Sequence, residues 1–192
     1  MRRPDLLVLL VLLVLLTAAT LPLASTAHAA DNCQMQISNA AVDYGATTRA
    51  ELLRKQVSPL MMSLGKQTVT LSATCRIPTL MTLFFRGAAA DGNAYKLGSG
   101  GSFTLRVLNA RLDGRAVGLG SVRVAGQAPE TKADALSLPP NIGAVPIIDD
   151  VPVKGSTLQL QVEIDAAIST TGSRIADRTV FRGAGNFELL EN

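Results

Sequence analysis

The sequence predicts an all-β protein built as an antiparallel β-sandwich, and three observations support this fold class. Apolar and polar residues alternate in several short runs, which is typical of strands that bury one face. Gly, Pro, Asn and Asp gather between these runs, where the chain must reverse. Helical patterns of about 10–15 residues do not separate the runs, so a parallel sheet built from βαβ units is disfavoured.

The alternating runs place their apolar residues on one face, which we expect to point into the interior. In chain order these residues are Cys33, Met35 and Ile37; Val69, Leu71, Ala73 and Cys75; Phe103, Leu105 and Val107; Val122 and Val124; Leu158, Leu160, Val162 and Ile164; and Phe187 and Leu189. The predicted turns between them lie at residues 43–45, 90–93, 98–101, 113–114, 139–140 and 154–155. The clearest runs predict six buried side chains, those of Val69, Leu71, Leu105, Leu160, Val162 and Phe187.

Two segments between the runs have a different pattern. Residues 49–64 carry a faint helical spacing of leucine and valine, which Pro59 limits. Residues 126–150 are rich in Pro, Ala and Gly, and this composition predicts a long irregular excursion. We do not expect this excursion to separate two domains, because neither side alone would hold a complete pair of sheets.

The N-terminus is predicted to be a signal peptide covering residues 1–29. Arg2 and Arg3 form a positive start, and residues 6–16 are an unbroken run of leucine and valine. These 11 apolar residues fall short of the about 20 that cross a bilayer as a helix. Ala27-His28-Ala29 supplies the small-x-small pattern of a signal peptidase site.

Cleavage after Ala29 would leave a single β-sandwich domain at residues 30–192. It would also remove His28, which is the only histidine of the chain. Two alternatives remain at this point, namely an uncleaved anchor and an earlier cleavage after Ala19.

Export changes how the two cysteines are interpreted. Cys33 and Cys75 lie in the apolar phase of their strands, and exported proteins meet an oxidising compartment. A disulfide between them is therefore expected. Two thiols without a histidine nearby are too few ligands for a zinc site.

The sequence contains no convincing catalytic constellation. Without His28, the triads and dyads that need histidine are impossible. The glycine-rich residues 98–101 precede a strand rather than a helix, so they do not form a phosphate loop. A formal charge of +3, scattered along the chain, does not indicate a nucleic-acid partner. We expect no cofactor and no metal, and the enzyme alternative would need Asp113, Asp149 or Asp165 to converge in space.

The order of motifs along the chain is more specific than any one of them. A signal peptide precedes Cys33 on a first strand, and Val42-Asp43-Tyr44-Gly45 follows. Residues 68–75 then form a second strand that ends at Cys75, and residues 83–87, 103–107 and 110–114 continue the pattern. This order resembles the subunits of chaperone–usher fimbriae, and within them a fimbrial-like family of otherwise unknown function. The resemblance covers most of residues 33–190, and it implies a pilin-like domain at residues 30–192.

This resemblance implies an immunoglobulin-like sandwich that lacks its last strand. The missing strand would leave an apolar groove, lined here by Val180, Phe187 and Leu189. A periplasmic chaperone would fill the groove first. Other fimbrial subunits would fill it afterwards by donor-strand complementation, at an outer-membrane usher. The expected role is cell adhesion by a non-enzymatic subunit, which passes through the periplasm of a Gram-negative bacterium to its surface.

The predicted mature N-terminus bears on the position of such a subunit in a fibre. Only Ala30, Asp31 and Asn32 precede Cys33, and three residues extend about 10 Å. The chain would therefore accept a donor strand without supplying one, as a tip or cap does. Cleavage after Ala19 would instead free residues 20–32 as a possible donor. The alternative function is a soluble periplasmic or secreted binding module with a complete sandwich.

Overall fold

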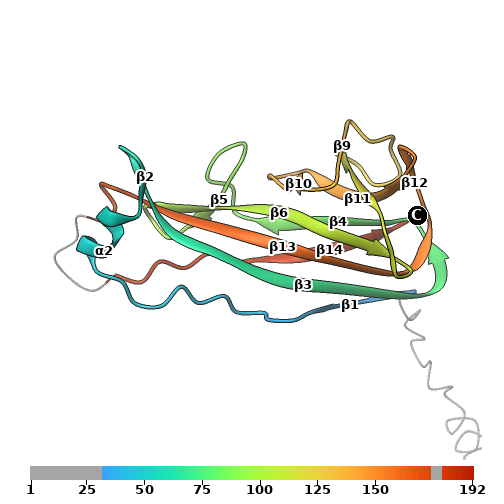
Figure 1. Ribbon diagram of the computed structural model, residues 1–192, viewed down its shortest axis with the longest axis horizontal. Coiled ribbons are helices and arrows are strands. Elements are labelled where there is room, and N and C mark those ends of the chain that lie inside the picture. The colour runs from blue at the N-terminus through green and yellow to red at the C-terminus, as the bar shows by residue number, and fades with distance from the viewer. Residues whose placement is uncertain (1–31, 174–178) are drawn as a thin grey trace, which may run out of the picture. The chain divides into compact units, whose positions relative to one another are not determined.

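The computed structural model describes residues 32–173 and 179–192. The predicted signal peptide therefore lies outside the described residues. Within these described residues, two antiparallel sheets pack face to face, and one short helix lies beside them (Figure 1). This arrangement confirms the predicted all-β antiparallel sandwich.

The first sheet contains the two longest strands of the described chain. Its strand order is β1 (Cys33–Ile37), β3 (Met61–Thr79), β13 (Gly155–Ser169), β6 (Gly101–Leu112) and β10 (Leu136–Ser137). Three short strands extend it, namely β2 (Gln56–Ser58) on β3, and β5 (Tyr95–Leu97) and β7 (Arg115–Ala116) on β6. Every pairing in this sheet is antiparallel, and β1 forms one of its edges.

The second sheet has the C-terminal strand at its edge. Its order is β14 (Gly185–Glu191), β4 (Met81–Gly87), β11 (Gly143–Ile148), β8 (Gly118–Val122) and β9 (Thr131–Ala133), with β12 (Val151–Pro152) paired to β11. These pairings are antiparallel as well. Each sheet thus ends in a strand from one end of the described chain, β1 in one case and β14 in the other.

The main core lies between the two sheets. Five of the six side chains predicted to be buried are at most 3% exposed: Val69, Leu71, Leu105, Leu160 and Val162. The sixth, Phe187, is only partly buried against this core, so that part of the prediction is wrong. Phe187 belongs to an edge strand beside a cavity, and no other strand of the described residues covers it on that side.

A smaller apolar cluster lies on the other face of the second sheet. Leu83 and Phe85 point into the main core, whereas Phe84 between them packs with Val122 and Val145. Neighbouring side chains of a strand point to opposite faces. The central strands of this sheet are therefore buried on both faces.

The predicted excursion at residues 126–150 is wrong in part. It contains β9, β10 and β11, and β11 lies in the middle of the second sheet with five of its six residues buried. A strand buried on both faces has no polar phase, so it gives no alternation to detect. The run around Val122 also ends earlier than predicted, since Val124 is exposed beyond β8.

The faint helical spacing at residues 49–64 corresponds to one short helix. This helix, α2 (Arg49–Arg54), begins at a capping box in which Thr48 and Glu51 satisfy each other's backbone N–H. Leu52 is its only buried residue, and the chain continues directly into β2 and β3. The helix is thus a local turn of the backbone before the long strand.

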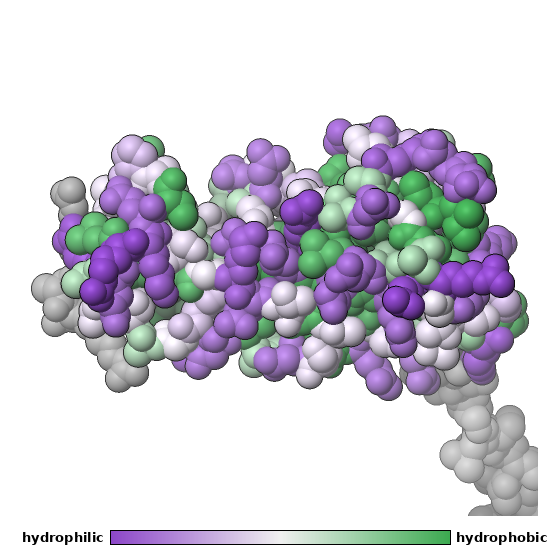
Figure 2. All heavy atoms as spheres, in the orientation of Figure 1, coloured by the Kyte–Doolittle hydropathy of each residue, from purple (hydrophilic) through white to green (hydrophobic). Residues whose placement is uncertain are grey.

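The outward surface is mainly polar on the face that Figure 2 shows. Apolar side chains gather there at the end that carries β11 and β12, and over α2 and β2 (Figure 2). Among the described residues, no helix combines the length and the hydropathy needed to cross a membrane.

Cys33 and Cys75 face each other in the β1–β3 register and are joined by a disulfide. Their Cα atoms are 3.9 Å apart, and both side chains are at most 9% exposed. The bond ties the five-residue edge strand β1 to the long strand β3. An edge strand of this length has few other contacts to hold it.

Replacing both cysteines by alanine is expected to lower the free energy of unfolding by about 2–5 kcal/mol, because the unfolded chain regains the freedom of the closed loop. Denaturant unfolding measures this difference, with Gln34→Ala on the exposed side of β1 as a control within about 0.5 kcal/mol of the wild type. The intact mass of the purified, air-exposed protein should lack the two thiol hydrogens. Free thiols in the native, air-exposed protein would contradict the disulfide.

Candidate binding groove

A cavity of about 970 Å³ opens between the edge strands of the two sheets. One wall is formed by β1 and by residues 38–48, which follow it, and the opposite wall is formed by residues 179–187. The floor consists of apolar side chains on the inner faces of the sheets. They include Leu71, Val69, Ile164, Ala166, Ile168, Phe85, Leu97, Phe103 and Leu105.

The backbone of β14 presents hydrogen-bonding groups to this cavity. Asn192 and Leu80 exchange two backbone hydrogen bonds of 3.0 Å each, which fixes the phase of the β14–β4 ladder. In an antiparallel ladder such pairs alternate with pairs whose N–H and C=O groups point away from each other. Leu189 and Phe187 occupy those alternate positions opposite Leu83 and Phe85. Their backbone groups therefore point to the free side of β14.

The free edge of β1 also presents backbone groups to the cavity. The N–H of Arg76 donates to the carbonyl of Asn32 at 3.0 Å, and the N–H of Ser38 donates to that of Thr70 at 2.9 Å. These bonds bracket β1, so the backbone groups of Met35 and Ile37 point away from β3. Neither edge is paired with another strand in the described chain. Two strand edges with unused backbone groups thus face one cavity.

One end of the cavity is closed by the C-terminal strand. The N–H of Cys33, which also points to the free side of β1, donates to the Oε1 atom of Glu191 at 3.0 Å. The cavity is lined by Met35 and Phe187, whereas Cys33 and Leu189 do not line it. It therefore runs from the level of Met35 towards α2 and the turn after β13.

The three residues predicted to line a groove are placed differently by the structure. Val180 is 62% exposed on the cavity wall, and Phe187 lines the cavity while partly buried. Leu189 packs against the main core nearer the closed end and is not a lining residue. The wall formed by residues 38–48 had no predicted role, although a turn was predicted within it at residues 43–45.

An aromatic cluster joins the cavity to the core behind it, with Phe85 and Phe103 on the floor, Phe187 on the wall and Tyr95 inside the core. The rings of Phe85 and Phe187 are 5.0 Å apart edge to face, and Phe85 makes similar contacts with Tyr95 at 4.8 Å and Phe103 at 6.0 Å. Gly185 lies directly against the ring of Phe85, where a Cβ atom would collide with it. The wall strand can approach the floor this closely because glycine has no side chain.

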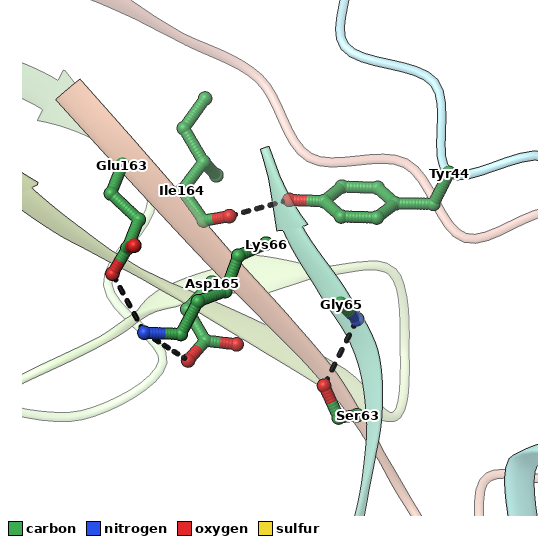
Figure 3. A network of polar contacts seen from close by, with 7 residues as sticks. All are labelled: Tyr44, Ser63, Gly65, Lys66, Glu163, Ile164 and Asp165. Atoms are coloured by element: carbon green, nitrogen blue, oxygen red, sulfur yellow. Dashed lines mark hydrogen bonds and ion pairs between the residues drawn. The ribbon is translucent and has the colours of Figure 1, made fainter. Parts of the chain in front are cut away.

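Tyr44 projects from the wall into the sandwich. Its hydroxyl donates a 2.8 Å hydrogen bond to the backbone carbonyl of Ile164 on β13 (Figure 3). Burial, together with the nearby charge of Asp165, raises the pKa of Tyr44 to about 12. The second tyrosine, Tyr95, lies inside the core, where burial likewise raises its pKa to about 12.

The carboxylates considered for an enzyme do not come together. Asp113 accepts hydrogen bonds from the N–H groups of Ser156 and Thr157 at the start of β13. Asp165 lies on β13 eight residues beyond Thr157, which corresponds to about 27 Å of strand. Asp149 lies in the turn between β11 and β12 of the other sheet. In the described parts of the chain, no group of three or more His, Cys, Asp or Glu residues could hold a metal ion.

No protein-family model matches the sequence, and no curated protein matches it. Among solved structures, the chain is similar to the crystal structure of the P pilus rod subunit PapA, with a TM-score of 0.44 and 12% sequence identity. The similarity covers 84% of this chain and 100% of that one.

The two tyrosines give the fold a pH dependence in the alkaline range. A phenol whose pKa is raised in the folded state stabilises that state below its unfolded pKa of about 10, and the stabilisation is lost as the pH rises towards 12. The free energy of unfolding should therefore decrease between pH 10 and 12. Urea unfolding at a series of pH values measures it, and Tyr44→Phe and Tyr95→Phe should each reduce the slope. Phenolate absorbance appearing near pH 10 in the folded protein would contradict both shifts.

Proposed function

We propose that this chain is an exported, non-enzymatic fimbrial or pilus subunit that accepts a β-strand from a partner protein. The observation that supports this best is the pair of opposing strand edges beside an apolar cavity. Met35 and Ile37 on one side, and Phe187 and Leu189 on the other, direct unused backbone groups to the gap between the sheets. An inserted strand would bond to such edges and bury alternate side chains on the floor.

The dimensions of the cavity suit an extended segment. Its floor runs from Leu71, which pairs with Leu160, to Ile168 near the end of β13. That span of about nine residues corresponds to about 30 Å of strand. A strand of eight or nine residues with alternating apolar side chains would fill it, and its outward side chains would remain in solvent.

The resemblance stated above indicates which partners would supply the strand. A periplasmic chaperone would cover the open edges first, which prevents edge-to-edge aggregation. At an outer-membrane usher, another fimbrial subunit would then replace the chaperone strand. The function of the assembled fibre would be attachment of the cell to a surface.

Within a fibre, we place this subunit at an end, as a tip or cap. Cleavage after Ala29 leaves Ala30, Asp31 and Asn32 ahead of Cys33. Three residues span about 10 Å and cannot fill a cavity of this length in a neighbour. N-terminal sequencing of the exported protein tests this placement, and a start at Thr20 would overturn it.

The strand-accepting role is tested with synthetic peptides of nine residues. An alternating apolar peptide should raise the melting temperature of the exported chain, because it binds the folded state alone; at 100 times its Kd the stabilisation is about 2.7 kcal/mol. A peptide of the same composition without alternation should have no effect. Phe187→Ala should weaken peptide binding, while Val151→Ala, at an exposed site that does not line the cavity, should not.

Two results would contradict this proposal. Equal shifts with both peptides would show that binding does not depend on strand geometry. A monomer that is soluble alone and does not respond to the alternating peptide would indicate the soluble binding module instead.

A further inference from the structure

Residues 38–48, which we call the wall segment, connect β1 to α2 and form one side of the cavity. The segment is held firmly where it begins. The N–H of Ser38 donates to the Thr70 carbonyl at 2.9 Å, and the N–H of Thr70 donates to the Ser38 hydroxyl at 2.9 Å. It is held again where it ends, because Thr48 caps α2 and Leu52 of that helix is buried.

Between these two anchor points, the wall segment has mainly local hydrogen bonds. The N–H of Ala41 donates to the side chain of Asn39 at 3.2 Å, and the N–H of Gly45 donates to the carboxylate of Asp43 at 2.8 Å. Tyr44 makes the hydrogen bond that joins the middle of the segment to a strand in the described chain, and its acceptor is the carbonyl of Ile164. Val42 also packs against the core, but apolar packing sets no fixed distance, so the hydrogen bond of Tyr44 is the contact that fixes how far the wall lies from β13.

The local sequence explains how Tyr44 comes to point inward. The Asp43 carboxylate makes a turn with the N–H two residues later, a common use of this residue type. Gly45 then adopts a φ of +74°, which favours glycine. This turn directs the Tyr44 ring against the core, where it is partly buried.

The acceptor of this hydrogen bond lies in a fixed part of the sheet. The β3–β13 register shifts close by: Ala166 pairs with Gly65 and Ala167 with Ser63, so Leu64 is an extra residue on β3. The N–H of Gly65 donates to the Ser63 hydroxyl at 2.9 Å. Lys66 pairs with Glu163 at 2.8 Å and Asp165 at 3.9 Å, joining the two strands beside the bulge (Figure 3).

We propose that Tyr44 is a positioning residue that holds the wall segment against β13 and so sets the width of the cavity for an incoming strand. This inference rests on the proposed function. The hydroxyl carries the effect, since the aromatic ring alone packs without fixing a distance to the Ile164 carbonyl. Without this hydrogen bond, the wall segment must become ordered when a strand binds. The loss of entropy lowers the affinity of the protein for the strand.

Tyr44→Phe tests the proposal because it removes the hydroxyl and keeps the ring. Hydrogen exchange of the free protein should become faster at the amides of residues 39–47 and remain unchanged in β3 and β13. The Kd of the alternating nine-residue peptide should rise about three- to tenfold, the range for loss of one hydrogen bond. Binding is measured where each variant is fully folded, so that a change in global stability does not alter the Kd.

Tyr95→Phe is the matched control. Its hydroxyl donates to the Leu138 carbonyl at 3.1 Å inside the core, and Tyr95 does not line the cavity. This variant should lower the melting temperature without changing the exchange of the wall segment or the Kd. A second variant, Asp43→Ala, removes the turn that directs Tyr44 and should act in the same direction as Tyr44→Phe, whereas Asp43→Asn should preserve wild-type behaviour.

The outcomes separate this proposal from the proposed function. If the wild type binds the peptide and Tyr44→Phe changes neither wall exchange nor Kd, the role of Tyr44 is overturned and strand acceptance remains. If Tyr44→Phe accelerates wall exchange but the wild type binds no peptide, the anchoring by Tyr44 is supported and strand acceptance is overturned. Equal effects of Tyr44→Phe and Tyr95→Phe on the Kd would also overturn the positioning role.

Discussion

The pairing of β3 with β13 is the interaction on which the rest of the structure depends. These two strands run side by side from Thr79 and Gly155 to Met61 and Ser169. Every other element of the first sheet is attached to one of them, directly or through β6. Residues so far apart in sequence meet only after a large loss of chain entropy. Once they are paired, the part of the cavity floor that these two strands supply and the acceptor of the Tyr44 hydrogen bond are both in place.

The two sheets are closed unequally at their edges. At the edges opposite β1 and β14, the short strands β10 and β9 end the two sheets. On the near sides, β1 and β14 leave backbone groups directed at a shared apolar cavity, and the side chain of Glu191 bridges them at one end. Natural sheets usually cover, charge or shorten such edges. An edge of this kind, with an apolar floor beside it, is what the proposed strand-accepting role requires.

The parts of this fold that could be predicted from sequence are the strands with one solvent-exposed face and one buried face. The alternation at residues 68–75 and 158–164 predicted strands correctly because one side of the first sheet faces solvent. Strand β11 was missed because Ala144, Val145 and Ile147 are all buried, which removes the polar phase. The cavity was predicted only as an implication of family resemblance. Its wall and the role of Tyr44 depend on contacts between distant segments, and no local pattern contains them.

The disulfide also determines how tension would travel through the molecule. A pull applied ahead of Cys33 reaches Cys75 through the sulfur atoms and enters β3 directly, without loading the five-residue ladder of β1. The disulfide therefore prevents the segment between the cysteines, which are 42 residues apart, from extending. The fully stretched chain is shorter by about 140 Å as a result. The wall segment and most of β3 lie inside this closed loop and would carry none of the load, whereas the opposite wall at residues 179–187 lies outside it. Resistance to such a load is a matter of unfolding rate rather than equilibrium stability.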